Sequence, residues 1–193
     1  MNIDLALMHR AIQHYMKIGC SLASVPYLVD PDVMDWTCPE GVIDKRLTHS
    51  NGKQYVASAE QSFLQMEKEG KIGEEQPPML ALTPCYRDES VLDDNHLNIF
   101  LKLEIFIYNP KTLDMDVTLA AIMKQFFMKE GLKTRIISTL EGFDVLTLEG
   151  LELGSFGYRV SPKGVPYVYG TGLAEPRASY ALSHNETKNS GQP

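Results

Sequence analysis

One arginine and two aromatic residues are spaced so that they could bind a nucleotide. Arg87 ends an apolar run over residues 79–87, and a polar loop separates it from a second run over residues 99–108. Strict alternation along the second run puts four side chains on one strand face: Phe100, Lys102, Glu104 and Phe106. An aromatic ring can stack on a base while a guanidinium binds phosphate oxygens. The same pattern is typical of an exposed face with cross-strand ion pairs, and the pattern alone favours that plainer interpretation.

Caps and apolar residues at helical spacing predict three helices elsewhere in the chain. They are residues 5–18 after Asp4, residues 59–69 after the capping box of Ser58 and Gln61, and a segment from Asp114 or Asp116 to Gly131. The dipeptide Asn51-Gly52 separates residues 42–48 from residues 53–57 and is a strong signal for a hairpin.

Apolar and β-branched runs predict the strands. They are residues 21–29, 79–87, 99–108, 133–138, 143–148, 151–160 and 166–170. Pro26 cannot donate a ladder hydrogen bond, which places residues 21–29 at a sheet edge or an interface. Strands in hairpins with helices irregularly between them predict an α+β fold, a mainly antiparallel sheet flanked by helices. We expect one domain over residues 1–182 and a polar, disordered tail over residues 183–193.

The composition is that of a globular protein with a negative net charge. The chain has 193 residues, of which 44% are hydrophobic and 22% charged, and its formal net charge of −7 disfavours non-specific nucleic-acid binding. Its cysteines and histidines lack the spacing of a metal or redox site. No segment has the ~20 apolar residues of a membrane span, and the N-terminus lacks a signal-peptide pattern. We therefore expect a cytoplasmic protein that has no membrane partner.

The segment from Cys85 to Phe106 resembles motif 2 of the class II aminoacyl-tRNA synthetases and is most similar to that of the pyrrolysyl-tRNA synthetases. Residues 5–29 resemble motif 1, residues 57–61 resemble the loop that contacts the amino acid, and residues 152–155 with 170–177 resemble motif 3. The four resemblances follow the family's order. They imply the family's catalytic-core fold, a homodimer, and activation of an amino acid or similar carboxylate as its adenylate with ATP and Mg²⁺.

The resemblance also implies a role for each matching residue. Arg87 and Arg177 would be catalytic: Arg87 would bind the α-phosphate, and Arg177 would cover the adenine opposite Phe100 or reach the γ-phosphate. The ATP-binding residues would be Arg87, Glu89, His96, Phe100, Gly172 and Arg177. Glu152 and Ser155 would hold Mg²⁺ through oxygen ligands. The residues on the amino-acid side would be Glu60, Glu104 and Phe106, with the two carboxylates near the substrate ammonium.

The sequence departs from the family pattern at motif 3. Pro176 stands directly before Arg177, and the acidic residue usually found there is displaced to Glu175. No anticodon-binding or editing domain is recognised, so we expect a stand-alone relative of the catalytic core. One hypothesis is a ligase that passes the activated acyl group to tRNA, a carrier protein or another acceptor. A second is a non-catalytic, dimeric regulatory or binding module, and a third is an accidental resemblance in a small α+β domain.

Overall fold

The computed structural model describes residues 3–37, 46–89, 92, 97–112 and 114–190, with residues 186–190 described by backbone alone. The helices in these residues are α1 (Leu5–Met16), α2 (Pro31–Thr37), α3 (Ala59–Lys68), α4 (Met115–Lys129) and α5 (Arg177–Ser190). The strands are β1 (Ser21–Leu22), β2 (Leu28–Val29), β3 (Gln54–Tyr55), β4 (Met79–Tyr86), β5 (Ile99–Tyr108), β6 (Thr134–Ser138), β7 (Gly142–Thr147), β8 (Glu152–Val160) and β9 (Pro166–Glu175).

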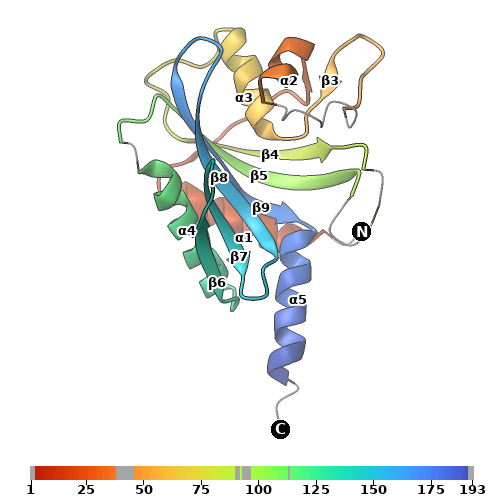
Figure 1. Cartoon of the computed structure of the whole chain (residues 1–193), viewed down its shortest axis with the longest axis vertical. Coiled ribbons are helices and arrows are strands. Elements are labelled where there is room, and N and C mark those ends of the chain that lie inside the picture. Colours follow the sequence, from red (N-terminus) through yellow and green to blue (C-terminus); the bar gives the residue numbers. More distant parts are fainter. Residues whose placement is uncertain (1–2, 38–45, 90–91, 93–96, 113, 191–193) are drawn as a thin grey trace.

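The described strands form one large sheet and one small sheet (Figure 1). The large sheet has seven strands in the order β1-β4-β5-β9-β8-β7-β6, and the small sheet pairs β2 with β3. The edge strand β1 runs parallel to β4, and the neighbouring strands from β4 to β6 are antiparallel. The predicted α+β fold with a mainly antiparallel sheet is confirmed.

Helices cover both faces of the large sheet and create two separate cores. The first core lies between the sheet and α1 and α4, and it includes Leu103 and Ile105 of β5. The second core lies between the sheet and α2 and α3, and it includes Phe106 and Tyr108 of the same strand. The alternation predicted for β5 is therefore confirmed, because its odd and even positions enter different cores.

Short local signals were predicted well. Ser58 caps α3 in a complete capping box, since its hydroxyl accepts from the Glu60 amide while the Gln61 side chain accepts from the Ser58 amide. Gly52 has φ of 85° in the turn before β3, a left-handed conformation that glycine adopts without steric cost. Thr48 forms an isolated antiparallel bridge with Gln54 across this turn. Residues 42–45 of the predicted hairpin lie outside the described residues.

Three features differ from the sequence predictions. Residues 21–29 are not one strand, because Pro26 lies between β1 of the large sheet and β2 of the small sheet. No helix was predicted over residues 31–37, where α2 begins at Pro31, and a proline suits this position because the first helical turn needs no amide donor. The tail predicted to be disordered from residue 183 is helical to Ser190. Ala181 is buried and Asn185 donates to the Gly131 carbonyl oxygen at 3.0 Å, which holds α5 against the domain.

No helix in the described part of the chain is both long enough and apolar enough to span a membrane.

Phe106 lies in the second core. Its side chain is fully buried, and its ring stacks between Phe63 at 4.8 Å and Tyr167 at 4.9 Å between centroids. Stacked rings at this spacing pack tightly, so removing the middle ring opens a cavity that neighbours cannot fill.

We expect Phe106→Ala to lower the free energy of unfolding by roughly 3–5 kcal/mol, measured by urea denaturation. Phe100→Ala on the same face of β5 is the matched control, because Phe100 is only half-buried and its removal should cost far less. Equal losses in the two variants would contradict the placement of Phe106 in the core.

Candidate functional site

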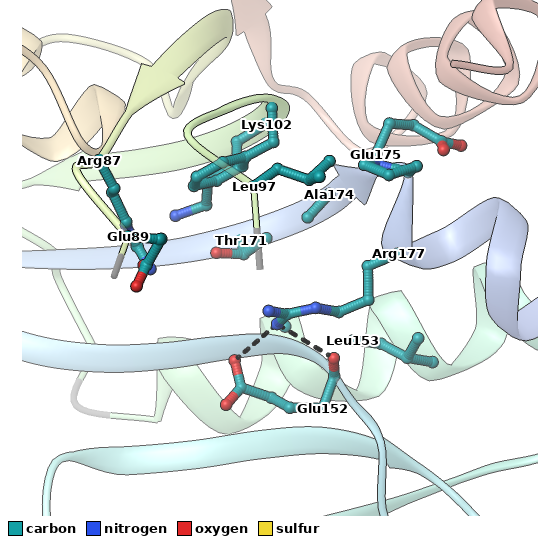
Figure 2. A pocket seen from close by; sticks show the side chains of 13 residues that line it. Arg87, Glu89, Leu97, Lys102, Glu152, Leu153, Thr171, Ala174, Glu175 and Arg177 are labelled. Carbon is teal, nitrogen blue, oxygen red and sulfur yellow. Dashed lines mark hydrogen bonds and ion pairs between the residues drawn. The ribbon is translucent and has the colours of Figure 1, made fainter. Parts of the chain in front are cut away.

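Two neighbouring cavities open on the face of the large sheet that carries α3, and they share part of their lining. The first, of about 190 Å³, is lined by residues from β5, β8, β9 and the start of α5, including Phe100. Figure 2 shows Glu152 and Arg177 in this lining. The second, of about 420 Å³, is lined by residues around α2 and the N-terminus of α3, including Ser58 and Glu60. Arg87, Glu89 and Lys102 line both cavities, so the two spaces meet at these three residues.

Arg87 follows directly after β4 and is fixed by the neighbouring strand. Its amide donates to the Asn98 carbonyl oxygen at 2.9 Å, just before β5 begins. Its guanidinium carbon lies 5.1 Å from the centre of the Phe100 ring, within the range of a cation–π contact. The structure therefore brings Arg87 and Phe100 together in the first cavity, as the sequence predicted from their places on successive strands.

Arg177 is the first residue of α5 and extends across the first cavity towards β8 (Figure 2). Its Nη1 donates to the Glu152 carbonyl oxygen at 3.3 Å and lies 3.8 Å from Glu152 Oε1. Pro176 does not turn the arginine into solvent, and Glu175 is not its partner in these contacts. Glu175 is instead fully buried and accepts from the Ser179 hydroxyl at 2.7 Å.

A bulge in β8 places the two predicted Mg²⁺ ligands on one face of the sheet. Gly154 lies opposite Val145, yet Glu152 lies opposite Leu146, so Leu153 is an extra residue in the strand. Without the bulge, residues three positions apart would point to opposite faces. Glu152 lines the first cavity and Ser155 does not. Within the described residues, no group of three or more His, Cys, Asp or Glu side chains could hold a metal ion.

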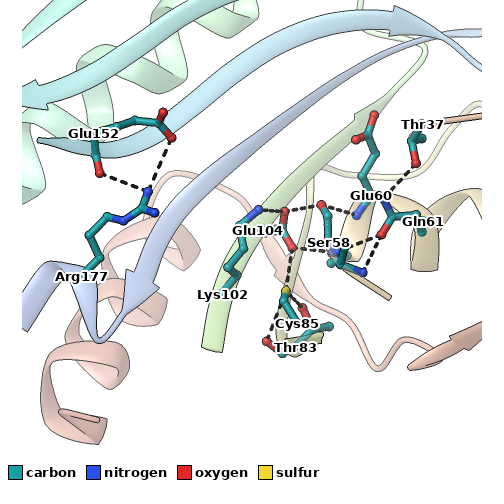
Figure 3. A network of polar contacts seen from close by, with 12 residues as sticks. Thr37, Ser58, Glu60, Gln61, Thr83, Cys85, Lys102, Glu104, Glu152 and Arg177 are labelled. Carbon is teal, nitrogen blue, oxygen red and sulfur yellow. Dashed lines mark hydrogen bonds and ion pairs between the residues drawn. The ribbon is translucent and has the colours of Figure 1, made fainter. Parts of the chain in front are cut away.

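Glu104 is a buried carboxylate whose oxygens are already bound by the protein (Figure 3). Its Oε1 accepts from the Ser58 hydroxyl at 2.5 Å and from Lys102 Nζ at 2.6 Å, and its Oε2 accepts from the Ala59 amide. Glu104 is not among the described residues that line either cavity. The ammonium of Lys102, rather than this carboxylate, therefore borders the two cavities.

Glu60 is also engaged by the protein itself. Arg159 Nη1 donates to both of its oxygens, at 3.0 and 3.1 Å, and the Tyr167 hydroxyl donates at 2.7 Å. Burial raises the pKa of Glu60, while the charge of Arg159 opposes that shift. The other end of the Arg159 guanidinium donates to the exposed Glu141 at 2.6 Å, and this arginine lines the second cavity. Sequence reasoning missed Arg159, although alternation along β8 puts it on the same face as Ser155.

Two other predicted site residues lie elsewhere, and a third lies outside the described part of the chain. Gly172 faces α1 instead of a cavity: a Cβ added there would come within 2.7 Å of the Tyr15 ring, and the Tyr15 hydroxyl donates to the Gly172 carbonyl oxygen at 2.9 Å. This glycine is required for close packing. Phe106 belongs to the second core and is not among the residues that line the cavities. His96 lies outside the described residues.

Solved structures with a similar fold include aminoacyl-tRNA synthetases. The chain aligns with a pyrrolysyl-tRNA synthetase from Desulfitobacterium hafniense at a TM-score of 0.74 and 16% identity, covering 93% of this chain and 67% of that one. It aligns with a seryl-tRNA synthetase from Pyrococcus horikoshii complexed with ATP at a TM-score of 0.79 and 17% identity, covering 92% of this chain and 49% of that one. The alignment with a serine-tRNA ligase from Naegleria fowleri in complex with AMP has a TM-score of 0.77 and 18% identity, and it covers 94% of this chain and 48% of that one.

These alignments identify the fold as that of a class II aminoacyl-tRNA synthetase catalytic core. The chain spans about half the length of the two seryl-specific enzymes and about two thirds of the pyrrolysyl enzyme. No protein-family model matches the sequence, and no curated protein matches it.

The buried Glu175 beside the first cavity makes stability depend on pH. Burial raises the pKa of its carboxyl, and its Oε2 has no hydrogen-bond partner within the described residues. The native state therefore holds this proton more tightly than the unfolded chain does. The contribution to stability is largest below the ordinary carboxyl pKa and is lost as pH rises through the raised value.

We expect Glu175→Gln to raise the melting temperature relative to wild type at pH 7–8, with a smaller gain at pH 4. Glu141→Gln is the control, because hydrogen bonding to Arg159 and the charge of Arg159 lower the pKa of its carboxyl, so its replacement should not raise the melting temperature at pH 7–8. A melting-temperature difference for Glu175→Gln that is the same at both pH values would contradict the assignment.

Proposed function

We propose that this protein activates a small carboxylic acid, an amino acid or a similar compound, as its adenylate at the expense of ATP. The observation that carries the proposal is the meeting of two cavities at Arg87. The first cavity offers a ring and two guanidiniums, which suit a nucleotide. The second is larger and begins where the first ends, so an acid bound there would have its carboxylate beside the α-phosphate.

The reaction requires one oxygen of the acid to attack the α-phosphorus. A bond forms between that oxygen and phosphorus, the bond to the β-phosphate oxygen breaks, and pyrophosphate leaves with the electron pair. Arg87 would bind the α-phosphate oxygens and stabilise the negative charge that develops on them. Phe100 and Arg177 would hold the nucleotide base between a ring and a guanidinium.

The residues of β8 fit a role in binding Mg²⁺ together with ATP. Mg²⁺ is commonly held by one or two carboxylates together with substrate phosphates rather than by a cage of protein ligands. Glu152 offers a half-exposed carboxylate at the first cavity, and Ser155 offers a hydroxyl on the same strand face. When bound, Mg²⁺ would neutralise phosphate charge. We further propose that the acyl group passes to tRNA, to a carrier protein or to another acceptor.

A second candidate function is a non-catalytic binding or regulatory module. The observation that favours it is that Glu60 and Glu104 are both occupied by internal donors, which leaves them poorly placed to hold a substrate ammonium. Such a module would still bind Mg-ATP or an amino acid and gain stability from it, by about 2.7 kcal/mol at a hundredfold excess over Kd. It would release no pyrophosphate, which separates it from the ligase.

We also propose a homodimer formed through residues 5–30. Large apolar side chains of this segment are exposed: Leu5, Met16, Ile18, Leu22 and Tyr27. The segment also contains the edge strand β1, which has no neighbour on its outer side within the described sheet. An exposed edge with apolar residues beside it is suited to pairing with a second copy.

Light scattering at micromolar concentration should give a mass of about twice the 21.7 kDa of one chain. Leu22→Asp should shift this mass towards that of one chain by placing a charge at the interface. Leu140→Asp is the control, since Leu140 is fully exposed in the turn before β7 and should leave the dimer intact. A wild-type mass near 22 kDa would count against the dimer.

ATP–pyrophosphate exchange against a panel of amino acids and related acids tests the ligase function directly. At least one acid should support exchange in the wild type. Arg87→Ala should lower the exchange rate about a hundredfold to a thousandfold, as expected for losing about 3–4 kcal/mol of charge stabilisation in the transition state. Its melting temperature should be unchanged, because Arg87 is only partly buried. Exchange near the wild-type rate in this variant would exclude Arg87 from the reaction.

A further inference from the structure

Lys102 lies on the wall between the two cavities. It belongs to β5, two residues after Phe100 and two before Glu104, and it lines both spaces. Only 12% of its side chain is exposed. A lysine at a sheet surface normally extends into water, because its ammonium is strongly hydrated. Here the ammonium is instead kept inside, at the point where the cavities meet.

The surroundings of Lys102 leave part of its hydrogen-bonding capacity unused. An ammonium has three N–H donors. In the described part of the chain its partner is Glu104 Oε1, at 2.6 Å. Two donors therefore remain for a ligand in the cavities. Arg159 differs in its charge balance, because its guanidinium bonds two carboxylates, those of Glu60 and Glu141.

The anchor of this ammonium is itself rigid. Glu104 is bound by the hydroxyl of Ser58 and the amide of Ala59, which belong to the N-terminus of α3. A lysine side chain ordinarily loses much rotamer entropy when it binds an anion. Because Glu104 already holds Nζ in place, the lysine side chain loses less entropy when a ligand binds, and its charge is already positioned for that ligand.

We propose that Lys102 is a second cationic contact for the α-phosphate, acting beside Arg87 at the junction of the two cavities. This inference rests on the proposed function, since it assumes that a nucleotide occupies the first cavity. Its physical basis is the charge of the reaction. An anionic carboxylate must approach an anionic phosphate, and a fixed cation where the two meet reduces their repulsion.

A purely structural ion pair is the competing explanation. Buried ion pairs often contribute little to stability, so Lys102 could serve only to neutralise Glu104, whose other contacts fasten β5 to α3. The two explanations differ in what they predict for ligands. Loss of a purely structural pair would change the affinities for adenosine and AMP equally, whereas loss of a phosphate contact would change the affinity for AMP alone.

The test compares the binding of adenosine and AMP by calorimetry in wild type, Lys102→Met and Lys68→Met. The Kd of adenosine divided by the Kd of AMP measures how much the phosphate contributes to affinity. We expect Lys102→Met to reduce this ratio roughly tenfold or more, as for loss of a charge-assisted hydrogen bond. Lys68→Met is the control, because Lys68 pairs with Asp30 and Asp32 on the outer surface and should leave the ratio unchanged.

The other outcomes are equally informative. A ratio within about threefold of wild type in Lys102→Met would overturn the inference while the ligase function stands on pyrophosphate exchange. If wild type bound neither AMP nor adenosine and supported no exchange, the proposed function would fail and this inference with it. Should Lys102→Met not fold, Lys102→Gln and Lys102→Arg replace it. The glutamine variant should lose the AMP preference and the arginine variant should keep most of it, and the reverse result would reject the proposal.

Discussion

The buried carboxylate of Glu104 joins β5 of the large sheet to the start of α3. A charge removed from water is costly unless other groups satisfy it. Here the donors come from separate parts of the chain: Lys102 in β5, and Ser58 and Ala59 at the cap of α3. The carboxylate therefore fixes the helix end above the strand. The wall of the second cavity and the position of the Lys102 ammonium both follow from this attachment.

Features that depend on short sequence distances could be predicted from the sequence. The cap of α3 requires only Ser58 and Gln61, three residues apart, and the two faces of β5 follow from the period of the pleat. The closeness of Arg87 and Phe100 could also be predicted, because antiparallel pairing of β4 with β5 brings the two ends of one hairpin together. The antiparallel sheet itself is the sum of such local signals.

Features that depend on how deeply a side chain is buried, or on contacts between residues far apart in the sequence, could not be predicted. Alternation placed Phe106 on the correct face of β5, but it carries no information on how far α3 extends over that face, and Phe106 lies beneath it. Arg159 pairs with Glu60 across 99 positions, a contact that no local pattern indicates. The bulge at Leu153 puts Glu152 and Ser155 on one face, where strict alternation would put them on opposite faces, and an extra strand residue leaves no clear mark in the sequence. Gly172 lies in the segment that resembles motif 3, but a glycine is required there for close packing against Tyr15.

The wall shared by the two cavities has an energetic consequence. If ligands bind in both cavities as proposed, they would share the charges of Arg87, Glu89 and Lys102, so binding in one cavity would change the affinity of the other. If a ligand in one cavity changes the affinity for a ligand in the other by some factor, the second ligand changes the affinity for the first by the same factor, because linkage between two binding equilibria is reciprocal. The side chains that divide the space would therefore also set the coupling free energy between the two ligands.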